Sequence, residues 1–268
     1  MRNNSLASIN KQKDRKFTSS LARGLSILEA FDQSHPRLGI ADLAKKTGLS
    51  KSTIYRLVYT LRSLGYIIPY GQGHKYMLGP KVLNLGFAVL SSLDMREIAQ
   101  PYLLRLSRLV KETVNLAVLD EWNLVYVERI KTQQIININL HVGSRLELYN
   151  TAMGRVLAAF REKEWIKKYL KYLKKIPEAE PYWKNKGEIL SKILAEVREK
   201  DFALNNQELT PGLLSVASPV RNREGQVIAA VNIAVSSSRY SLEILKKEMI
   251  LPLRQTTQAI SLALGFRA

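Results

Sequence analysis

Hydrogen-bonding and cationic side chains are concentrated in one short stretch of the chain, at Lys51, Ser52, Thr53, Tyr55 and Arg56. Lys and Arg pair with phosphate, and hydroxyl groups donate hydrogen bonds to phosphate oxygens. The planar guanidinium fork of Arg56 also matches the O6/N7 edge of guanine. These residue types at this spacing predict contacts with nucleic acid, with Arg56 as the candidate for reading a base.

The elements that must position this stretch follow from the apolar spacing around it. Ile40, Leu43 and Ala44 share one face of a short predicted helix, and Gly48 tolerates the positive φ of a tight turn. Ser50 stands at the N-cap position of a second helix. On a helical projection of that helix, the apolar residues Ile54, Leu57, Val58, Leu61 and Leu64 fall within an arc of about 120°, opposite Ser52, Arg56, Tyr59 and Ser63.

This arrangement is typical of a helix-turn-helix, in which the polar face of the second helix, Tyr59 included, enters the major groove. Two short strands, at 66–68 and 75–78, are predicted to form a hairpin directly after it. A hairpin in this position is a wing, and its tip would bring Gln72, His74 and Lys75 to the DNA. A preceding helix, marked by Leu21, Leu25, Leu28 and Phe31, is predicted to support the other two.

The charge of the chain agrees with a polyanionic partner. The formal net charge is +18, and residues 1–90 carry 14 Lys and Arg against 4 Asp and Glu. Clustered positive charge attracts phosphates and gains free energy by releasing their counterions. Residues 1–17 are polar and basic, without the apolar stretch of a signal peptide, and are expected to be a disordered tail.

Composition excludes several kinds of chemistry. The chain has no cysteine, and its three histidines, His35, His74 and His141, lie on separate segments. No catalytic or phosphate-binding motif is present, so we expect no enzyme activity, no metal and no cofactor. No apolar run is long enough to span a bilayer, and a cytoplasmic protein without membrane contact is expected.

A length of 268 residues predicts two domains. Pro80 opens an apolar-periodic helix that ends at Ser91-Ser92, the expected domain boundary. Beyond it the sequence predicts strands at 113–119, 124–130 and 136–142, a helix at 151–160, and Lys-rich helices at 163–174 and 187–200. A hairpin at 215–221 and 226–236 and a closing helix at 240–264 follow. These elements predict an α+β domain.

The sequence resembles the isocitrate-lyase-regulator (IclR) family over nearly the whole chain from about Phe17. The resemblance rests on SLARGLSILEAF, LAKKTGLSKSTIYRLVYTLRSLGY and KYMLGPKVLNLG, and continues through VGSRLELYNTAMGRVLAAF, GLLSVASPVR and AAVNIAVSSSR. It implies a winged helix-turn-helix over 18–79, a linker helix over 80–93 and a GAF-like effector-binding domain over 94–268. It also implies a transcriptional regulator that binds operator DNA.

The resemblance further implies a small-molecule pocket between the start of the TAMGR helix, the loop before GLLS and the last strand. The matching positions are Ala152, Met153, Asn205, Asn206, Ser215, Asn232 and Ala234. A helix N-terminus and neutral amide donors suit a carboxylate, because no acidic side chain among them repels it. A small organic acid is therefore expected, with an aromatic carboxylate first because the closing segment looks most like the subgroup that governs the breakdown of aromatic acids.

The family also implies a homo-oligomer, a dimer or a tetramer. Two other functions remain open from the residues alone. A non-specific nucleic-acid-binding protein fits the basic charge but gives no role to a folded domain of about 170 residues. A small-molecule enzyme is the other alternative, but the chain lacks a catalytic constellation.

Overall fold

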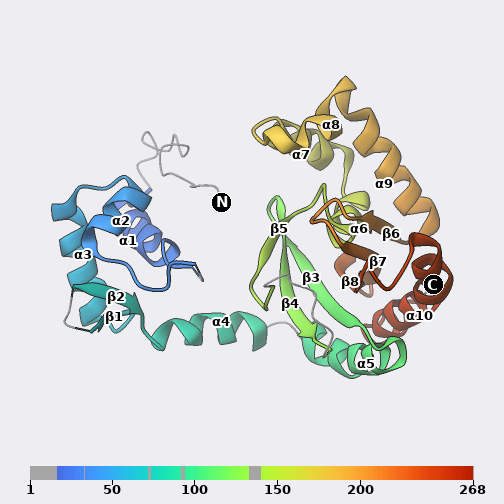
Figure 1. The fold of residues 1–268 in the computed structure, drawn as a ribbon, viewed down its shortest axis with the longest axis horizontal. Helices are drawn as coiled ribbons and strands as arrows, with labels where there is room; N and C mark the ends of the chain where they lie inside the picture. The colour runs from blue at the N-terminus through green and yellow to red at the C-terminus, as the bar shows by residue number, and fades with distance from the viewer. Residues whose placement is uncertain (1–16, 33, 72–73, 92–93, 133–139, 268) are drawn as a thin grey trace. The chain divides into compact units, whose positions relative to one another are not determined.

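The computed structural model describes residues 17–32, 34–71, 74–91, 94–132 and 140–267 (Figure 1). The expected basic tail lies outside them except for Phe17, and Gln72 lies outside them as well. Residue contacts divide the chain into two compact units, Met1–Ser92 and Leu93–Ala268. Each unit is described by itself below.

The first unit contains the three predicted helices and the predicted hairpin. Its elements are α1 (Ser19–Glu29), α2 (Ile40–Thr47), α3 (Lys51–Ser63), β1 (Ile67–Tyr70), β2 (Lys75–Leu78) and α4 (Lys81–Ser91). The core is formed by one or two apolar residues from each of the first elements: Ile27, Leu43, Ile54, Val58 and Ile67. The winged helix-turn-helix predicted from the apolar spacing is therefore confirmed.

The turn between α2 and α3 depends on two residues. Gly48 has φ 73°, a left-handed conformation that is easy only for glycine. The Ser50 hydroxyl accepts a hydrogen bond from the Thr53 backbone N–H at 3.3 Å and caps α3. An isolated β-bridge joins the wing to the loop between α1 and α2. In it, Leu38 and Tyr76 exchange backbone hydrogen bonds of 3.0 and 2.9 Å.

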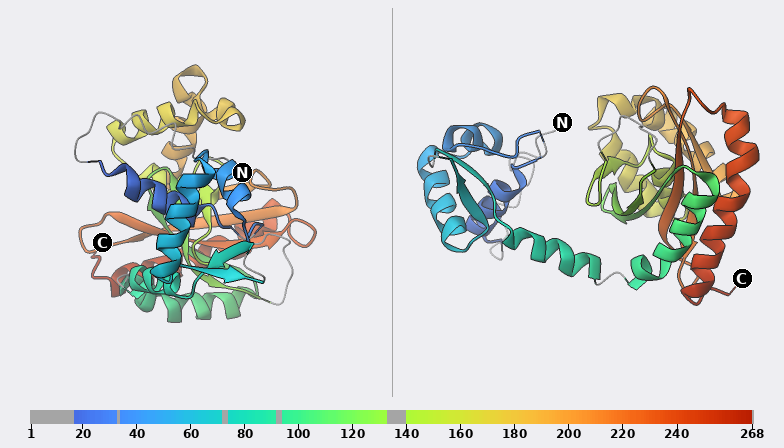
Figure 2. Two further views of the ribbon diagram at one scale, coloured as in Figure 1. Left: turned by 90° about the vertical axis from the view of Figure 1, so that its left-hand side faces the viewer. Right: turned by 60° about the horizontal axis from the view of Figure 1, so that its bottom comes forward.

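The second unit is built on a six-stranded antiparallel sheet in the order β5-β4-β3-β8-β7-β6 (Figure 2). The strands are β3 (Thr113–Asp120), β4 (Asn123–Ile130), β5 (Arg145–Glu147), β6 (Ala203–Asn206), β7 (Leu213–Arg221) and β8 (Val227–Ser236). Helices α5 (Asp94–Val110) and α10 (Leu242–Ala263) pack together and cover one face.

The other face of the sheet is covered by α6 (Ala152–Ala159), which contacts β3, β4, β6, β7 and β8. Outside α6 lie α7 (Lys163–Leu173), α8 (Glu180–Trp183) and α9 (Glu188–Lys200), with short 3-10 turns at Pro177–Ala179 and Asn185–Gly187. The expected α+β architecture with an N-terminal winged helix is thus found. No helix in the described ranges has the length and apolarity that crossing a membrane requires.

Several details differ from the sequence-based expectations. The described end of the strand predicted at 136–142 is not a strand, because Leu140 and His141 are irregular and Val142 begins a turn that leads into β5. Residues 136–139 lie outside the described part. Leu64 is 51% exposed and forms the C-cap of α3, and Leu21 and Leu25 face away from the core that Ile27 enters.

Candidate functional site

The exposed face of α3 carries the side chains predicted to contact DNA. Lys51, Ser52 and Arg56 are exposed, and Tyr55 and Tyr59 project their rings with 65% and 68% of their surface accessible. Thr53 is half-buried, and its hydroxyl lies 2.9 Å from that of the N-cap Ser50. The N-terminus of α3, which carries the positive end of the helix dipole, therefore lies beside a cationic and hydroxylated surface.

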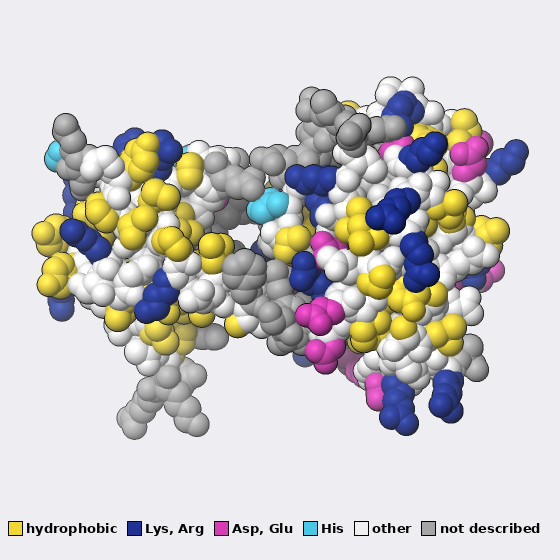
Figure 3. Space-filling view, turned by 90° about the horizontal axis from the view of Figure 1, so that it is seen from below, with side chains coloured by type: hydrophobic (Ala, Val, Ile, Leu, Met, Phe, Trp, Pro, Cys, Tyr) yellow, Lys and Arg dark blue, Asp and Glu magenta, His cyan; other side chains and the backbone are white. Residues whose placement is uncertain are grey.

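The charged side chains of this helix and of the wing are all positive. No Asp or Glu occurs between Leu43 and Leu93, so α3 and the wing carry only Lys, Arg and neutral side chains. His74 and Lys75 are exposed beside the described start of β2. Figure 3 shows Lys and Arg side chains among apolar ones on one face of this unit. Such a surface suits a phosphate backbone.

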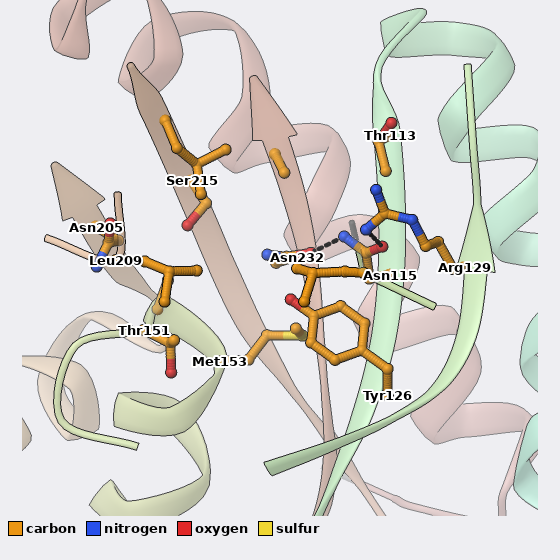
Figure 4. A pocket seen from close by; sticks show the side chains of 14 residues that line it. Thr113, Asn115, Tyr126, Arg129, Thr151, Met153, Asn205, Leu209, Ser215 and Asn232 are labelled. Carbon is orange, nitrogen blue, oxygen red and sulfur yellow. Dashed lines mark hydrogen bonds between the residues drawn. The ribbon is translucent and has the colours of Figure 1, made fainter. Parts of the chain in front are cut away.

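The second unit contains a pocket between the sheet and the start of α6 (Figure 4). It is narrow, with about 450 Å³ of space free of protein atoms, including its opening to solvent. Six of the seven positions implied by the family resemblance line it together: Ala152, Met153, Asn205, Ser215, Asn232 and Ala234. The remaining lining residues are Thr113, Asn115, Tyr126, Arg129, Leu140, Thr151, Leu209 and Leu213.

Asn206 is the exception, and its placement corrects the sequence-based expectation. Asn205 and Asn206 were expected in the loop before GLLS, but they end the edge strand β6, in which successive side chains point to opposite faces. Asn205 is 1% exposed and faces the pocket, whereas Asn206 is exposed and lies outside it.

Arg129 and Tyr126 are pocket residues that the sequence analysis missed. Both lie on β4, three positions apart, and in a regular strand they would point to opposite faces. The register shifts between Leu116 and Ala117, so that Asn115 pairs with Arg129 and Ala117 pairs with Tyr126. This β-bulge turns both side chains toward the same face of the sheet.

A chain of hydrogen bonds crosses the floor of the pocket. Arg129 Nη1 donates to Asn115 Oδ1 at 3.1 Å, and Asn115 Nδ2 donates to Asn232 Oδ1 at 2.7 Å. Asn115 and Asn232 are direct register partners on β3 and β8. The three side chains therefore form one fixed network (Figure 4).

Charge in the pocket comes from Arg129 alone among the described lining residues. Desolvation by burial lowers the pKa of its guanidinium below the usual value, and no carboxylate of the described chain forms an ion pair with it. Burial also raises the pKa of Tyr126 to about 12, so its phenol stays neutral at physiological pH. The pocket thus has one cation in an otherwise neutral lining, whereas the sequence analysis expected neutral donors only.

The opposite side of the pocket is formed by α6 and the segment that follows β6. The Thr151 hydroxyl accepts from the Gly154 N–H at 3.1 Å and caps α6. Asn205 Nδ2 donates to the Asn150 carbonyl at 2.6 Å. Arg155 on α6 pairs with Glu208, and the Glu208 carboxylate also accepts from the Tyr182 hydroxyl at 2.7 Å. These contacts hold the segment that carries Leu209 against α6.

The described residues contain no group of three or more His, Cys, Asp or Glu arranged to hold a metal ion. His141 is exposed, and its Nδ1 lies 2.9 Å from the Ser144 hydroxyl. His35 is paired with Asp32 at 3.0 Å on the first unit.

Comparisons with known proteins identify the family of both units. Residues 20–67 match the IclR helix-turn-helix domain, and residues 87–262 match the bacterial transcriptional regulator IclR C-terminal domain. The HTH-type transcriptional regulator KdgR of Escherichia coli is 34% identical over 260 residues, which cover 97% of each chain.

Solved structures share the fold over almost the whole chain. An IclR family transcriptional regulator from Brucella abortus has 27% identity and a TM-score of 0.80, covering 98% of this chain and 99% of its own. An IclR homologue from Microbacterium hydrocarbonoxydans, complexed with 4-hydroxybenzoate, has a TM-score of 0.76 at 24% identity and covers 91% of this chain and 98% of its own. The chain belongs to the IclR family of bacterial transcriptional regulators, and its N-terminal helix-turn-helix is the family's DNA-binding domain.

Proposed function

We propose that this protein is a regulator whose binding to operator DNA, or whose activity there, changes when a small organic acid occupies the pocket of the second unit. The observation that carries the proposal is Arg129, a half-buried cation without a carboxylate partner in a neutral pocket. A buried charge is costly unless it is paired, and a ligand carboxylate would supply the missing partner.

In DNA binding, the side chains on the exposed face of α3 have different roles. Arg56 reads a base in the major groove, while Lys51, Ser52 and Thr53 hold phosphates at the helix N-terminus. Tyr55 and Tyr59 add contacts along the groove, and His74, Lys75 and the wing tip at Gln72 approach the backbone beside it.

Self-association follows from the geometry of reading DNA. A single recognition helix covers only a few base pairs, and symmetric dimers read two half-sites. Leu21 and Leu25 on α1 and Leu83 and Leu85 on α4 are all about half exposed, between 49% and 62%. We propose that these leucines pair two copies of the first unit, in a dimer or in a tetramer made of two such dimers.

The aromatic acids are the first ligands to test. The related homologue from Microbacterium hydrocarbonoxydans was solved with 4-hydroxybenzoate, and Tyr126, Met153 and Leu209 give this pocket an apolar lining beside Arg129. An apolar body with one carboxylate fits such a lining.

Gel-shift titration with genomic fragments, with and without organic acids, tests the proposal. We expect one or a few fragments to be retained at salt concentrations that release random DNA, and an acid to change the protein concentration needed for retention. Equal retention of all fragments would instead favour a non-specific nucleic-acid-binding protein, which the charge of +18 alone would allow.

A further inference from the structure

A second hollow of the second unit, which we call the α7 groove, is lined by cations on both walls. One wall is α7, and the other is the segment at 183–186, where α8 passes into α9 (Figure 1). The groove has about 1180 Å³ of space free of protein atoms, including its opening to solvent, and shares no lining residue with the pocket between the sheet and α6. Six of its ten lining residues are lysines: Lys167, Lys168, Lys171, Lys174, Lys184 and Lys186.

Most of this charge is not neutralised by carboxylates of the protein. Residues 161–186 carry nine Lys and Arg against four Glu. Lys167 pairs with Glu164 at 2.6 Å, and Lys184 pairs with Glu180 at 2.9 Å. In the described part of the chain, the other four lysines of the groove form no salt bridge. A cleft lined by charge of one sign concentrates ions of the opposite sign, so the α7 groove attracts anions.

The backbone of the second wall has an unusual conformation that fixes it against α7. Asn185, Lys186 and Gly187 have φ of 49°, 58° and 79°, three successive left-handed residues, and only a glycine adopts this conformation without cost. A Cβ at Gly187 would lie 2.7 Å from the Leu170 side chain, so the turn packs directly on α7. Strain of this kind is concentrated at functional sites, and here it places Lys186 on the wall that faces the α7 lysines.

The lysines of α7 form a row. Lys167, Lys171 and Lys174 follow one another at spacings of four and three, so they lie on one face of the helix. At about 1.5 Å per residue, the row is about 10 Å long. One strand of duplex DNA presents a phosphate about every 3.4 Å along its axis, so the row spans about three successive phosphates.

The residue types favour a nucleic-acid backbone over an acidic protein. Every cation of the groove is a lysine, whose ammonium acts as a point charge, and none is an arginine, whose planar fork pairs with a carboxylate through two hydrogen bonds. Interfaces between proteins are depleted in lysine and enriched in arginine. Contacts between lysine and phosphate, in contrast, give affinity for DNA without reading its sequence.

We propose that the α7 groove is a second DNA site, which binds phosphates of duplex DNA other than those contacted by α3 and the wing. The inference rests on the proposed function, since it adds a second contact with the DNA that the helix-turn-helix holds. The groove has no preference for sequence, and it increases both the affinity for long DNA and the dependence of that affinity on salt.

Removing charge from the groove tests the inference on the full-length protein. The four lysines without a salt bridge, Lys168, Lys171, Lys174 and Lys186, would be replaced together by glutamine. The matched control replaces Lys192, Lys200, Lys246 and Lys247 by glutamine, which removes the same charge from exposed positions of the second unit outside the groove. Circular dichroism would check that both variants are folded.

Anisotropy titrations at several salt concentrations would use two long duplexes, one with the operator and one of random sequence. Each phosphate contact adds about 0.9 to the slope of log K on log salt, so the groove variant should lose about three from this slope on both duplexes. Its fall in affinity between about 50 and 200 mM salt should then be about 40-fold smaller than that of wild type, and the control should resemble wild type. Arginine at the same four positions should keep the wild-type slope.

Equal slopes in the groove variant and the control would overturn the second DNA site. The proposed function would stand in that case, provided that wild type still prefers the operator to random DNA. Loss of that preference in wild type would refute the proposed function, while the slope on random duplex would still test the groove. Poly-glutamate is the probe for an acidic protein. If the groove variant lost poly-glutamate binding and kept its slope on DNA, the groove would belong to an acidic protein and the inference would fail.

Discussion

The side-chain amide of Asn115 donates to Asn232 at 2.7 Å, although the two residues are 117 positions apart in the chain. They face one another across β3 and β8, the central strands of the sheet. The floor of the pocket therefore exists only after distant strands have paired. It is a product of the folded sheet rather than of a local motif.

Removing the Arg56 side chain separates base reading from phosphate binding. Arg56→Ala should lower affinity for the operator by roughly 1–3 kcal/mol and relax discrimination at one base pair in each half-site. Lys51→Ala should weaken binding to all sequences about equally and reduce the salt dependence. Fluorescence anisotropy on operator variants at several salt concentrations measures both. Unchanged operator affinity in a folded Arg56→Ala protein would remove Arg56 from base reading.

The start of α6 depends on a glycine that allows close packing. A Cβ at Gly154 would collide with the backbone of Leu148 and with the Thr151 hydroxyl that caps the helix. Gly154→Ala should therefore destabilise the second unit by about 1–3 kcal/mol, by chemical denaturation. The matched control is Gly86→Ala on α4, where a Cβ meets nothing within 4 Å. That substitution should be neutral or slightly stabilising, because alanine favours helix. Equal stability of Gly154→Ala and wild type would contradict the packing described here.

The exposed Leu21 and Leu25 of α1 allow the proposed self-association to be tested. Wild-type protein should sediment as a dimer or larger at micromolar concentration, and Leu21→Asp combined with Leu25→Asp should shift it toward monomer, because charges would be buried at the interface. Ile189→Asp, on the 49% exposed Ile189 of α9, is the control and should leave the oligomer intact. A wild-type monomer, with and without DNA, would refute the proposed pairing.

The ion pair between Asp32 and Lys46 should make the stability of the first unit depend on pH. Its pKa is lowered to about 2, chiefly by the Lys46 ammonium at 2.7 Å and also by His35. A carboxyl with a depressed folded-state pKa contributes stability above its unfolded pKa of about 4, and loses it as the pH falls toward 2. The contribution is small, since Asp32 is half exposed. Calorimetry of Asp32→Asn should show a lower melting temperature than wild type at pH 7, and the difference should shrink below pH 4. A difference that persisted unchanged at pH 2 would exclude this ion pair as its source.

The sequence predicts the N-terminal unit well because its signals are local. The glycine turn at Gly48, the cap at Ser50 and the stripe through Ile54 and Val58 are each set by neighbours a few residues away. Helix α5 also has a local signal that the sequence analysis missed, because the apolar residues Met95, Ala99 and Leu103 are buried at helical spacing. Pro101 within it resembles a helix breaker.

The pocket is less predictable from the sequence for a physical reason. The bulge opposite Leu116 and Ala117 brings Tyr126 and Arg129 to one face, and strict alternation would place them on opposite faces. Asn205 faces the pocket and Asn206 does not, because the two lie in a strand rather than in a loop. That strand forms only by pairing with β7. Arg129, the cation of the pocket, could not be assigned to the pocket without knowing the register in which β3 and β4 pair.

The central claim is that occupancy of this pocket changes DNA binding. An organic acid that raises the melting temperature of the wild-type protein would be added to an anisotropy titration of operator DNA, with wild type, Ala152→Trp and Arg129→Gln in parallel. Ala152 is 1% exposed on the pocket wall, so a tryptophan there fills the space that the ligand needs. Arg129→Gln removes the charge with little change in volume, and it tests the pocket should the larger substitution impair folding. The acid should shift the wild-type dissociation constant about fivefold or more, in either direction. Both folded variants should bind DNA as wild type does without acid and should not respond to it. A response equal to that of wild type in both variants would contradict the account.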